Sequence, residues 1–90
     1  MKIKKGVQKE YFEIVADGRK RFEIRLGNMR CKPGDILVLE EKIGEKKKTG
    51  RKIDCEVLYK FNTKDVEKYY SKKDIEKYGL LVLAIRRSYN

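Results

Sequence analysis

The apolar residues of this 90-residue sequence occur in short runs separated by charged residues, glycine and proline, and this spacing constrains the fold most strongly. The longest run, Leu80–Ile85, is far shorter than the roughly 20 apolar residues that a helix needs to cross a bilayer. A chain of this length has one small core, so we expect a single domain over residues 1–90. The first residues lack the apolar core of a secretion signal, which predicts a cytoplasmic protein.

Short runs of this kind are typical of short strands joined by turns. Apolar residues alternate from Ile53 to Tyr59, which predicts a strand whose core face includes Cys55 and Tyr59. The sequence Gly44–Gly50 before it predicts an exposed hairpin loop, and Pro33–Gly34–Asp35 predicts a turn. By alternation or by continuous apolar character, further strands are expected at residues 2–7, 21–25, 36–39 and 80–87.

Two segments have the periodicity of helices. An apolar stripe over residues 8–17 predicts a helix that ends at Gly18, because glycine tolerates the left-handed backbone of a helix C-terminus. Residues 63–78 predict a broken helix, in which Ser71 is the N-cap of a second short helix. The order of elements predicts an α+β protein, a small mixed β-barrel of five to six strands with two to three short helices.

Charge and composition restrict the chemistry that the chain can perform. With 24 Lys and Arg against 14 Asp and Glu, the formal net charge is +10, and there is no histidine. Imidazole bases and Ser-His or Cys-His nucleophiles are therefore excluded, and metal sites lose their commonest ligand. Cys31 and Cys55 form no CxxC pair, so we expect no metal and no cofactor.

The excess of positive charge favours a nucleic acid or another anionic partner. The abundance of lysine and the scarcity of Asn and Gln are also typical of proteins adapted to high temperature, in which charges solvate the surface. The most concentrated basic residues, Lys46–Lys48 with Arg51 and Lys52, can contact the phosphates of an RNA backbone or form a solvated hairpin tip.

The most informative segment is Gly18–Arg25, which follows directly on the predicted helix. Lys20 and Arg25 can bind a phosphate or a carbonyl oxygen, and arginine can do so through two hydrogen bonds. Glu23 can hold both cations in position or accept a hydrogen bond from the amino group of a nucleobase. The same residues can also form an ion-pair ladder on the solvated face of a strand.

The pattern Gly18-x-Lys20-x-x-Glu23-x-Arg25 resembles the GxKxxExR signature of the ASCH domain, a member of the PUA-like superfamily. The resemblance, to a small single-domain prokaryotic or archaeal type, covers roughly residues 3–86. Outside the motif it rests on Tyr11–Phe12, Asn28, Arg30, Pro33–Gly34–Asp35, Leu37–Glu41, Thr49–Gly50–Arg51 and the closing strand Leu81–Ile85.

The resemblance implies a PUA-like barrel that binds RNA or a modified nucleoside in a cleft around the motif. We expect a monomer with an RNA or nucleotide ligand and with no membrane or metal partner. The expected binding residues are Lys20, Glu23, Arg25, Asn28, Arg30 and Arg51.

Some proteins that resemble this chain are hydrolases, which leaves a second interpretation. One group deacetylates N4-acetylcytidine with a lysine, a threonine and a glutamate, and others are described as nucleases. Lys20 matches the lysine, whereas Glu23 stands where that group has the threonine. The alternative is a metal-independent hydrolase with Lys20 and Glu23 as catalytic residues, and Glu40 and Glu56 are both candidates for the distant carboxylate.

Overall fold

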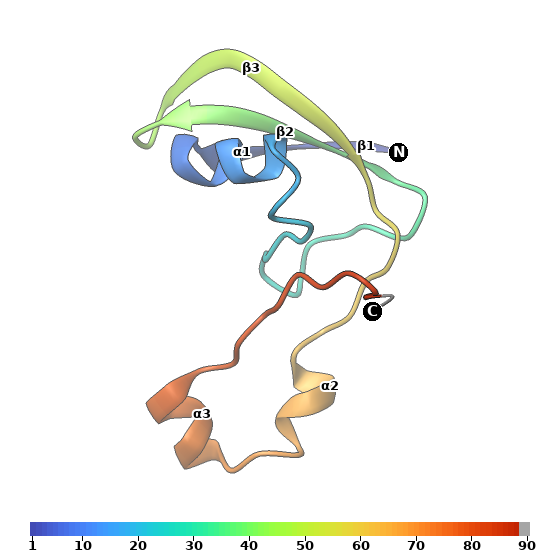
Figure 1. The fold of residues 1–90 in the computed structure, drawn as a ribbon, viewed down its shortest axis with the longest axis vertical. Helices are drawn as coiled ribbons and strands as arrows, with labels where there is room; N and C mark the ends of the chain where they lie inside the picture. Colours follow the sequence, from blue (N-terminus) through green and yellow to red (C-terminus); the bar gives the residue numbers. More distant parts are fainter. Residues whose placement is uncertain (89–90) are drawn as a thin grey trace.

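Three strands form one mixed sheet in the computed structural model, which describes residues 1–88 (Figure 1). β1 (Lys2–Gln8) pairs in parallel with β2 (Ile36–Ile43), and β2 pairs antiparallel with β3 (Lys47–Glu56). Two neighbouring parallel strands need a crossover connection, because the chain must return to the end of the sheet at which the first strand began. That crossover consists of α1 (Lys9–Ala16) and the following loop, which lie below the sheet in Figure 1.

The core lies between α1 and the sheet. Phe12 of α1 is 1% exposed and packs with Val7 of β1 and with Leu37 and Leu39 of β2. Burial of a phenylalanine side chain contributes about 1.5–3 kcal/mol, so Phe12 is a main link between helix and sheet. Partly buried side chains from the strands, the helix and the loops complete the core: Ile3, Val15, Met29, Ile53, Cys55 and Val57.

The predicted helix before Gly18 and the predicted strand at residues 36–39 are confirmed. The helix before Gly18 is present, and Gly18 has a positive φ of 85°. The continuous apolar run of β2 is buried at Leu37, Val38 and Leu39. The hairpin turn is shorter than predicted, because the residues from Lys47 onward already belong to β3.

The predicted strand at residues 21–25 is wrong, since these residues have no regular secondary structure. Within this segment the side chain of Glu23 is 17% exposed, whereas Ile24 is 62% exposed. Arg25 Nη2 donates a hydrogen bond to the carbonyl oxygen of Gly6 in the edge strand β1. The segment is therefore attached to the sheet through side chains, not through a ladder of backbone hydrogen bonds.

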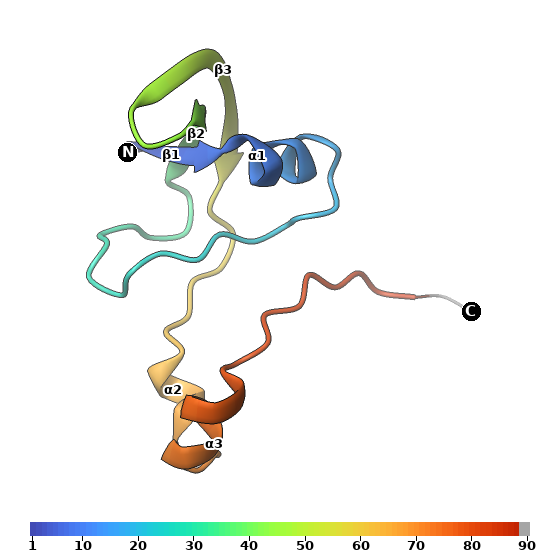
Figure 2. The ribbon, with the colours of Figure 1, turned by 90° about the vertical axis from the view of Figure 1, so that its left-hand side faces the viewer.

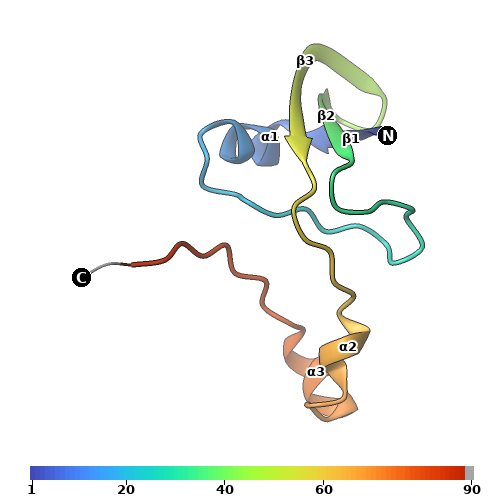
Figure 3. The ribbon, with the colours of Figure 1, turned by 90° about the vertical axis from the view of Figure 1, so that its right-hand side faces the viewer.

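The broken helix is confirmed as α2 (Lys64–Glu67) and α3 (Lys72–Tyr78), which lie apart from the sheet in Figures 2 and 3. Ser71 Oγ accepts a hydrogen bond of 3.0 Å from the backbone N–H of Asp74, as expected of an N-cap. The helix ends at Gly79, whose φ is 68°.

The predicted closing strand at residues 80–87 is not formed, and Leu81 and Ile85 are 87% and 85% exposed. Tyr59, expected on the core face, is 81% exposed. The reason is that β3 ends at Glu56, and Val57 makes the last sheet-like bonds, to Gly34 and Asp35. The α+β class is confirmed, but the strands in residues 1–88 form an open three-stranded sheet, whereas the sequence predicted a barrel of five to six strands.

No helix within the described residues 1–88 has the length and apolar character required to span a membrane. The same residues contain no group of three or more Cys, Asp and Glu side chains that could hold a metal ion. Both cysteines are free thiols.

Candidate functional site

Three of the predicted site residues, Lys20, Glu23 and Arg25, meet in the loop after α1. Glu23 Oε1 lies 2.7 Å from Lys20 Nζ, and Glu23 Oε2 accepts a hydrogen bond of 2.9 Å from Arg25 Nε. Arg25 Nη2 lies 2.8 Å from the same Oε2 atom. One carboxylate thus joins two cations, and the group, hereafter the Lys20–Glu23–Arg25 cluster, has a net charge of +1.

Further bonds hold the cluster in place. Lys20 Nζ donates to the carbonyl oxygen of Phe22 at 3.0 Å and lies 4.9 Å from the centre of the Phe22 ring. Arg25 Nη2 donates to the carbonyl oxygen of Gly6 at 2.9 Å. The side chains of Lys20, Glu23 and Arg25 are 15%, 17% and 29% exposed, so water screens these pairs less than it screens exposed ones.

The cluster keeps hydrogen-bonding capacity for a ligand. A guanidinium has five N–H donors, and within residues 1–88 the Nη1 group of Arg25 has no hydrogen-bond partner. A carboxylate has about four acceptor positions, and hydrogen bonds from Lys20 and Arg25 occupy two of them at Glu23. The cluster therefore offers donors from Arg25 beside a remaining acceptor position on Glu23.

Beside the cluster is a hollow of about 600 Å³, which we call the first hollow. Its volume is within the range of small-molecule sites, about 300–1,000 Å³. Tyr11, which is half-exposed, and Phe22 supply aromatic rings to it. The first hollow is lined by Gly6, Val7, Gln8, Tyr11, Ile14, Arg19, Lys20, Phe22, Glu23, Ile24 and Arg25. Most of the exposed surface of this lining is apolar, and its charged residues are the cluster and Arg19.

Asn28 and Arg30, which were expected to flank the motif, line a different hollow of about 410 Å³. This second hollow is lined by Met1, Gly27, Asn28, Met29, Arg30, Cys31, Lys32, Asp35 and Lys60. Lys60 Nζ donates a hydrogen bond of 2.8 Å to the carbonyl oxygen of Cys31. Three of its nine lining residues, Arg30, Lys32 and Lys60, have cationic side chains, against the one carboxylate of Asp35.

Asp35 is a buried acid at the second hollow that sequence reasoning read as a turn residue. It is 2% exposed, and its Oδ2 accepts a hydrogen bond of 2.9 Å from the backbone N–H of Lys32. Its Oδ1 lies 3.2 Å from the nitrogen of Met1. The backbone N–H of Lys32 is the main cause that lowers the pKa of Asp35 below its usual value.

Arg51 was expected among the binding residues, but the structure places it elsewhere. Arg51 Nη1 donates to Glu13 of α1 at 2.6 Å and to Glu41 of β2 at 3.3 Å, and its guanidinium lies 5.0 Å from the ring centre of Phe12. The hydrogen bond to Glu13 is the main cause that raises the pKa of Arg51. The contacts of Arg51 therefore attach β3 to α1 and do not join the cluster.

Glu41, named above only as the end of the segment Leu37–Glu41, is a buried carboxylate. It is 3% exposed and accepts a hydrogen bond of 2.6 Å from Thr49 Oγ1. The alternation Leu37, Leu39, Glu41 along β2 was a usable signal, because residues two apart on a strand share a face. The neighbouring Glu40 points elsewhere and pairs with Lys48 at 3.4 Å.

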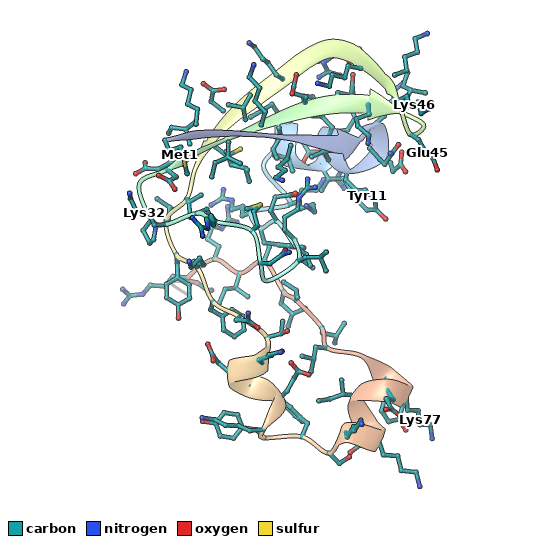
Figure 4. The ribbon with its side chains drawn as sticks, turned by 180° about the vertical axis from the view of Figure 1, so that it is seen from behind. Met1, Tyr11, Lys32, Glu45, Lys46 and Lys77 are labelled. Atoms are coloured by element: carbon teal, nitrogen blue, oxygen red, sulfur yellow. The ribbon has the colours of Figure 1, made fainter. Side chains whose placement is uncertain are left out.

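Cys55 lies near the cluster on the core side of the sheet. Its thiol pKa is raised, mainly by burial and secondly by the negative charge of Glu23. A raised pKa means less thiolate at neutral pH, and the side chain of Cys55 packs against the core. Lys46, Lys47 and Lys48 are exposed at the hairpin, and in Figure 4 Lys46 lies far from Lys32 at the second hollow.

The geometry bears on the hydrolase interpretation as well. Lys20 and Glu23 are in contact, but they form an ion pair with each other. Within the described residues, no serine or threonine lines the first hollow, and neither Glu40 nor Glu56 reaches its lining. The lining therefore holds a lysine and a carboxylate without the hydroxyl nucleophile that the N4-acetylcytidine mechanism uses.

Comparison with known proteins gives one match. A family model described as a domain of unknown function (DUF3850) matches residues 2–75, which include β1 to β3, α1 and both hollows. No curated protein and no solved structure matches the chain.

Proposed function

Since this chain belongs to the DUF3850 family of domains of unknown function, we propose its function from its own site. The first hollow binds RNA or a modified nucleoside, with a base in the hollow and the Lys20–Glu23–Arg25 cluster at its polar edge. The chain acts as a binding module that recognises its ligand through these groups.

One observation carries the proposal: the fixed carboxylate of Glu23 lies between two cations at the side of a largely apolar hollow. A nucleobase has the complementary features, an apolar face with donors and acceptors along its edge. The remaining acceptor position on Glu23 suits an exocyclic amino group, and Arg25 Nη1 suits a carbonyl or ring-nitrogen acceptor.

Two aromatic rings and the charge of the chain support the same ligand. Tyr11 and Phe22 line the first hollow, and a base stacked on an aromatic ring gains about 1–3 kcal/mol. The net charge of +10 attracts a polyanion over a longer range. The Gly18–Arg25 motif is similar to the ASCH signature, and this similarity supports the same ligand. We include the PUA-like barrel of that family in the proposal.

The test is a titration with short single-stranded RNA at several salt concentrations. Arg25→Ala should weaken binding at every salt concentration, because it removes donors from the edge of the hollow. Arg21→Ala is the matched control, since Arg21 lies in the same segment but outside the lining of the first hollow. Equal loss in both variants, or no binding by the unaltered protein, would contradict the proposal.

The hydrolase alternative has its own readout. Incubation with N4-acetylcytidine and with RNA, followed by mass spectrometry, reports any product. Product formation that Lys20→Ala abolishes would favour the enzyme, and binding without product favours the module.

A further inference from the structure

The second hollow differs from the first in chemistry, although the two adjoin along the chain. Arg25 lines the first hollow and Gly27 lines the second, with Leu26 between them. The backbone N–H of Met29 donates to the carbonyl oxygen of Leu26 at 3.1 Å, which closes a tight turn. Residues two positions apart in the chain have Cα atoms at most about 7 Å apart, so the two linings adjoin at Arg25 and Gly27, and one nucleotide-sized ligand can reach both hollows.

Cations dominate the second hollow. Arg30, Lys32 and Lys60 line it, and Asp35 is the carboxylate among the lining residues. Each oxygen of Asp35 already accepts a hydrogen bond, Oδ2 from the backbone N–H of Lys32 and Oδ1 from the charged nitrogen of Met1. The charge of Asp35 is therefore compensated within the fold, and the three side chains leave the hollow positive.

Two of these cations are suited to an external anion. Among residues 1–88 the guanidinium of Arg30 has no hydrogen bond or ion pair, and its side chain is exposed. Lys60 is held at the hollow by its bond to the carbonyl oxygen of Cys31, and that acceptor leaves its full positive charge in place. An ammonium and a guanidinium beside one hollow are the usual partners of a phosphate group.

We propose that the second hollow binds the phosphate adjacent to the base that occupies the first hollow, so that the ligand is a nucleotide or a single-stranded oligonucleotide and not a free nucleoside. This inference rests on the proposed function, because the base in the first hollow places the phosphate. The two hollows have different roles. The first hollow, apolar with a polar edge, selects a base, whereas phosphate contacts in the second hollow add affinity without reading sequence.

The test compares cytidine and adenosine with their 5′- and 3′-monophosphates and with the dinucleotides CpC and ApA, by calorimetric titration of the full chain. Both bases carry an exocyclic amino group that Glu23 can accept. For the unaltered protein we expect the phosphate to increase affinity at least about tenfold, since charge-assisted hydrogen bonds are stronger than neutral ones. The monophosphates and dinucleotides distinguish a terminal phosphate from a phosphodiester as the source.

The variants separate this inference from the proposed function. Arg30→Ala with Lys60→Ala should reduce nucleotide affinity to the level of the nucleoside and leave nucleoside affinity unchanged. The log–log salt slope for oligonucleotides should fall by about 0.7 for each lost phosphate contact. Lys46→Ala with Lys47→Ala is the matched control, because it removes the same charge at the exposed hairpin.

Each outcome decides the matter. Equal affinity for nucleoside and nucleotide, or an equal loss in the hairpin control, overturns this inference and leaves the proposed function standing. Binding of neither class overturns the proposed function, and the inference with it. Because Lys60 also bonds to Cys31, the single variant Arg30→Ala, which breaks no bond within residues 1–88, must show part of the same loss.

Discussion

Arg25 Nη2 lies 2.9 Å from the carbonyl oxygen of Gly6, and this hydrogen bond joins the loop after α1 to strand β1. The same guanidinium also binds Glu23, so its position is set from both the loop and the sheet. A side chain held at two points loses little further freedom when a ligand binds, which is how a site is preorganised. The site is thus built on a contact between residues far apart in the chain.

Glu23→Gln should destabilise the protein, because it removes the negative charge that separates the half-buried cations Lys20 and Arg25. Hydrogen bonds to charged groups are worth about 1.5–3 kcal/mol, so we expect a loss near the lower end of that range. Urea denaturation measures it, with Glu45→Gln at the exposed hairpin turn as the control. An equal effect of the two substitutions would contradict the role assigned to Glu23.

Neighbouring residues of α1 should separate stability from binding. Phe12→Ala should cost about 3–5 kcal/mol of unfolding free energy, because Phe12 is buried in the core. Tyr11→Ala should change stability little and weaken ligand binding, because Tyr11 is half-exposed and lines the first hollow. Denaturation and RNA titration of both variants check this pair, and a stable Phe12→Ala protein would contradict the packing described.

Asp35 should make stability depend on acid pH. Its pKa is lowered in the folded state, so the unfolded chain binds the proton more readily and stability is lost as the pH falls below the ordinary value of 3.8. Asp35→Asn should lower the melting temperature at pH 7 and flatten the decline of melting temperature in acid. Thermal melts from pH 2 to pH 7 measure both effects, and an unchanged acid slope would contradict the assignment.

Arg51→Ala should weaken the fold and leave the binding of short RNA ligands at the hollows unchanged. The substitution leaves the buried carboxylate of Glu41 with Thr49 as its remaining partner, which costs about 1–3 kcal/mol. Denaturation and titration with a mononucleotide give the two readouts. A tenfold loss of mononucleotide affinity in a folded Arg51→Ala protein would contradict this prediction and would show that Arg51 contributes to ligand binding.

Features set by neighbouring residues were predictable from the sequence. The stop at Gly18, the N-cap at Ser71 and the buried run of β2 depend on contacts within a few residues. That Lys20, Glu23 and Arg25 would meet was also predictable, although through the wrong element: the alternation suggested a strand, and the three side chains instead bind one another and fix an irregular loop.

Long-range partners were not predictable. The contacts of Arg51 with Glu13 and Glu41 depend on how α1 lies under the sheet, which no local pattern specifies. The exposure of Tyr59 was not predictable either. The alternation of apolar residues continues to Tyr59, although strand β3 ends at Glu56. A pattern of period two states which residues share a face, but it does not supply the neighbouring strand that makes the face a core.

The central claim is that the first hollow binds a base at the Lys20–Glu23–Arg25 cluster. The most direct measurement is an NMR titration of ¹⁵N-labelled protein with cytidine 5′-monophosphate, following the backbone amides and the Nε–H resonance of Arg25. The account predicts saturable shifts at Arg25 Nε–H and at the backbone amides of residues 20–25 and 11, and loss of the backbone amide shifts in Arg25→Ala. Shifts confined to Lys46–Lys48, or no shifts at all, would contradict it.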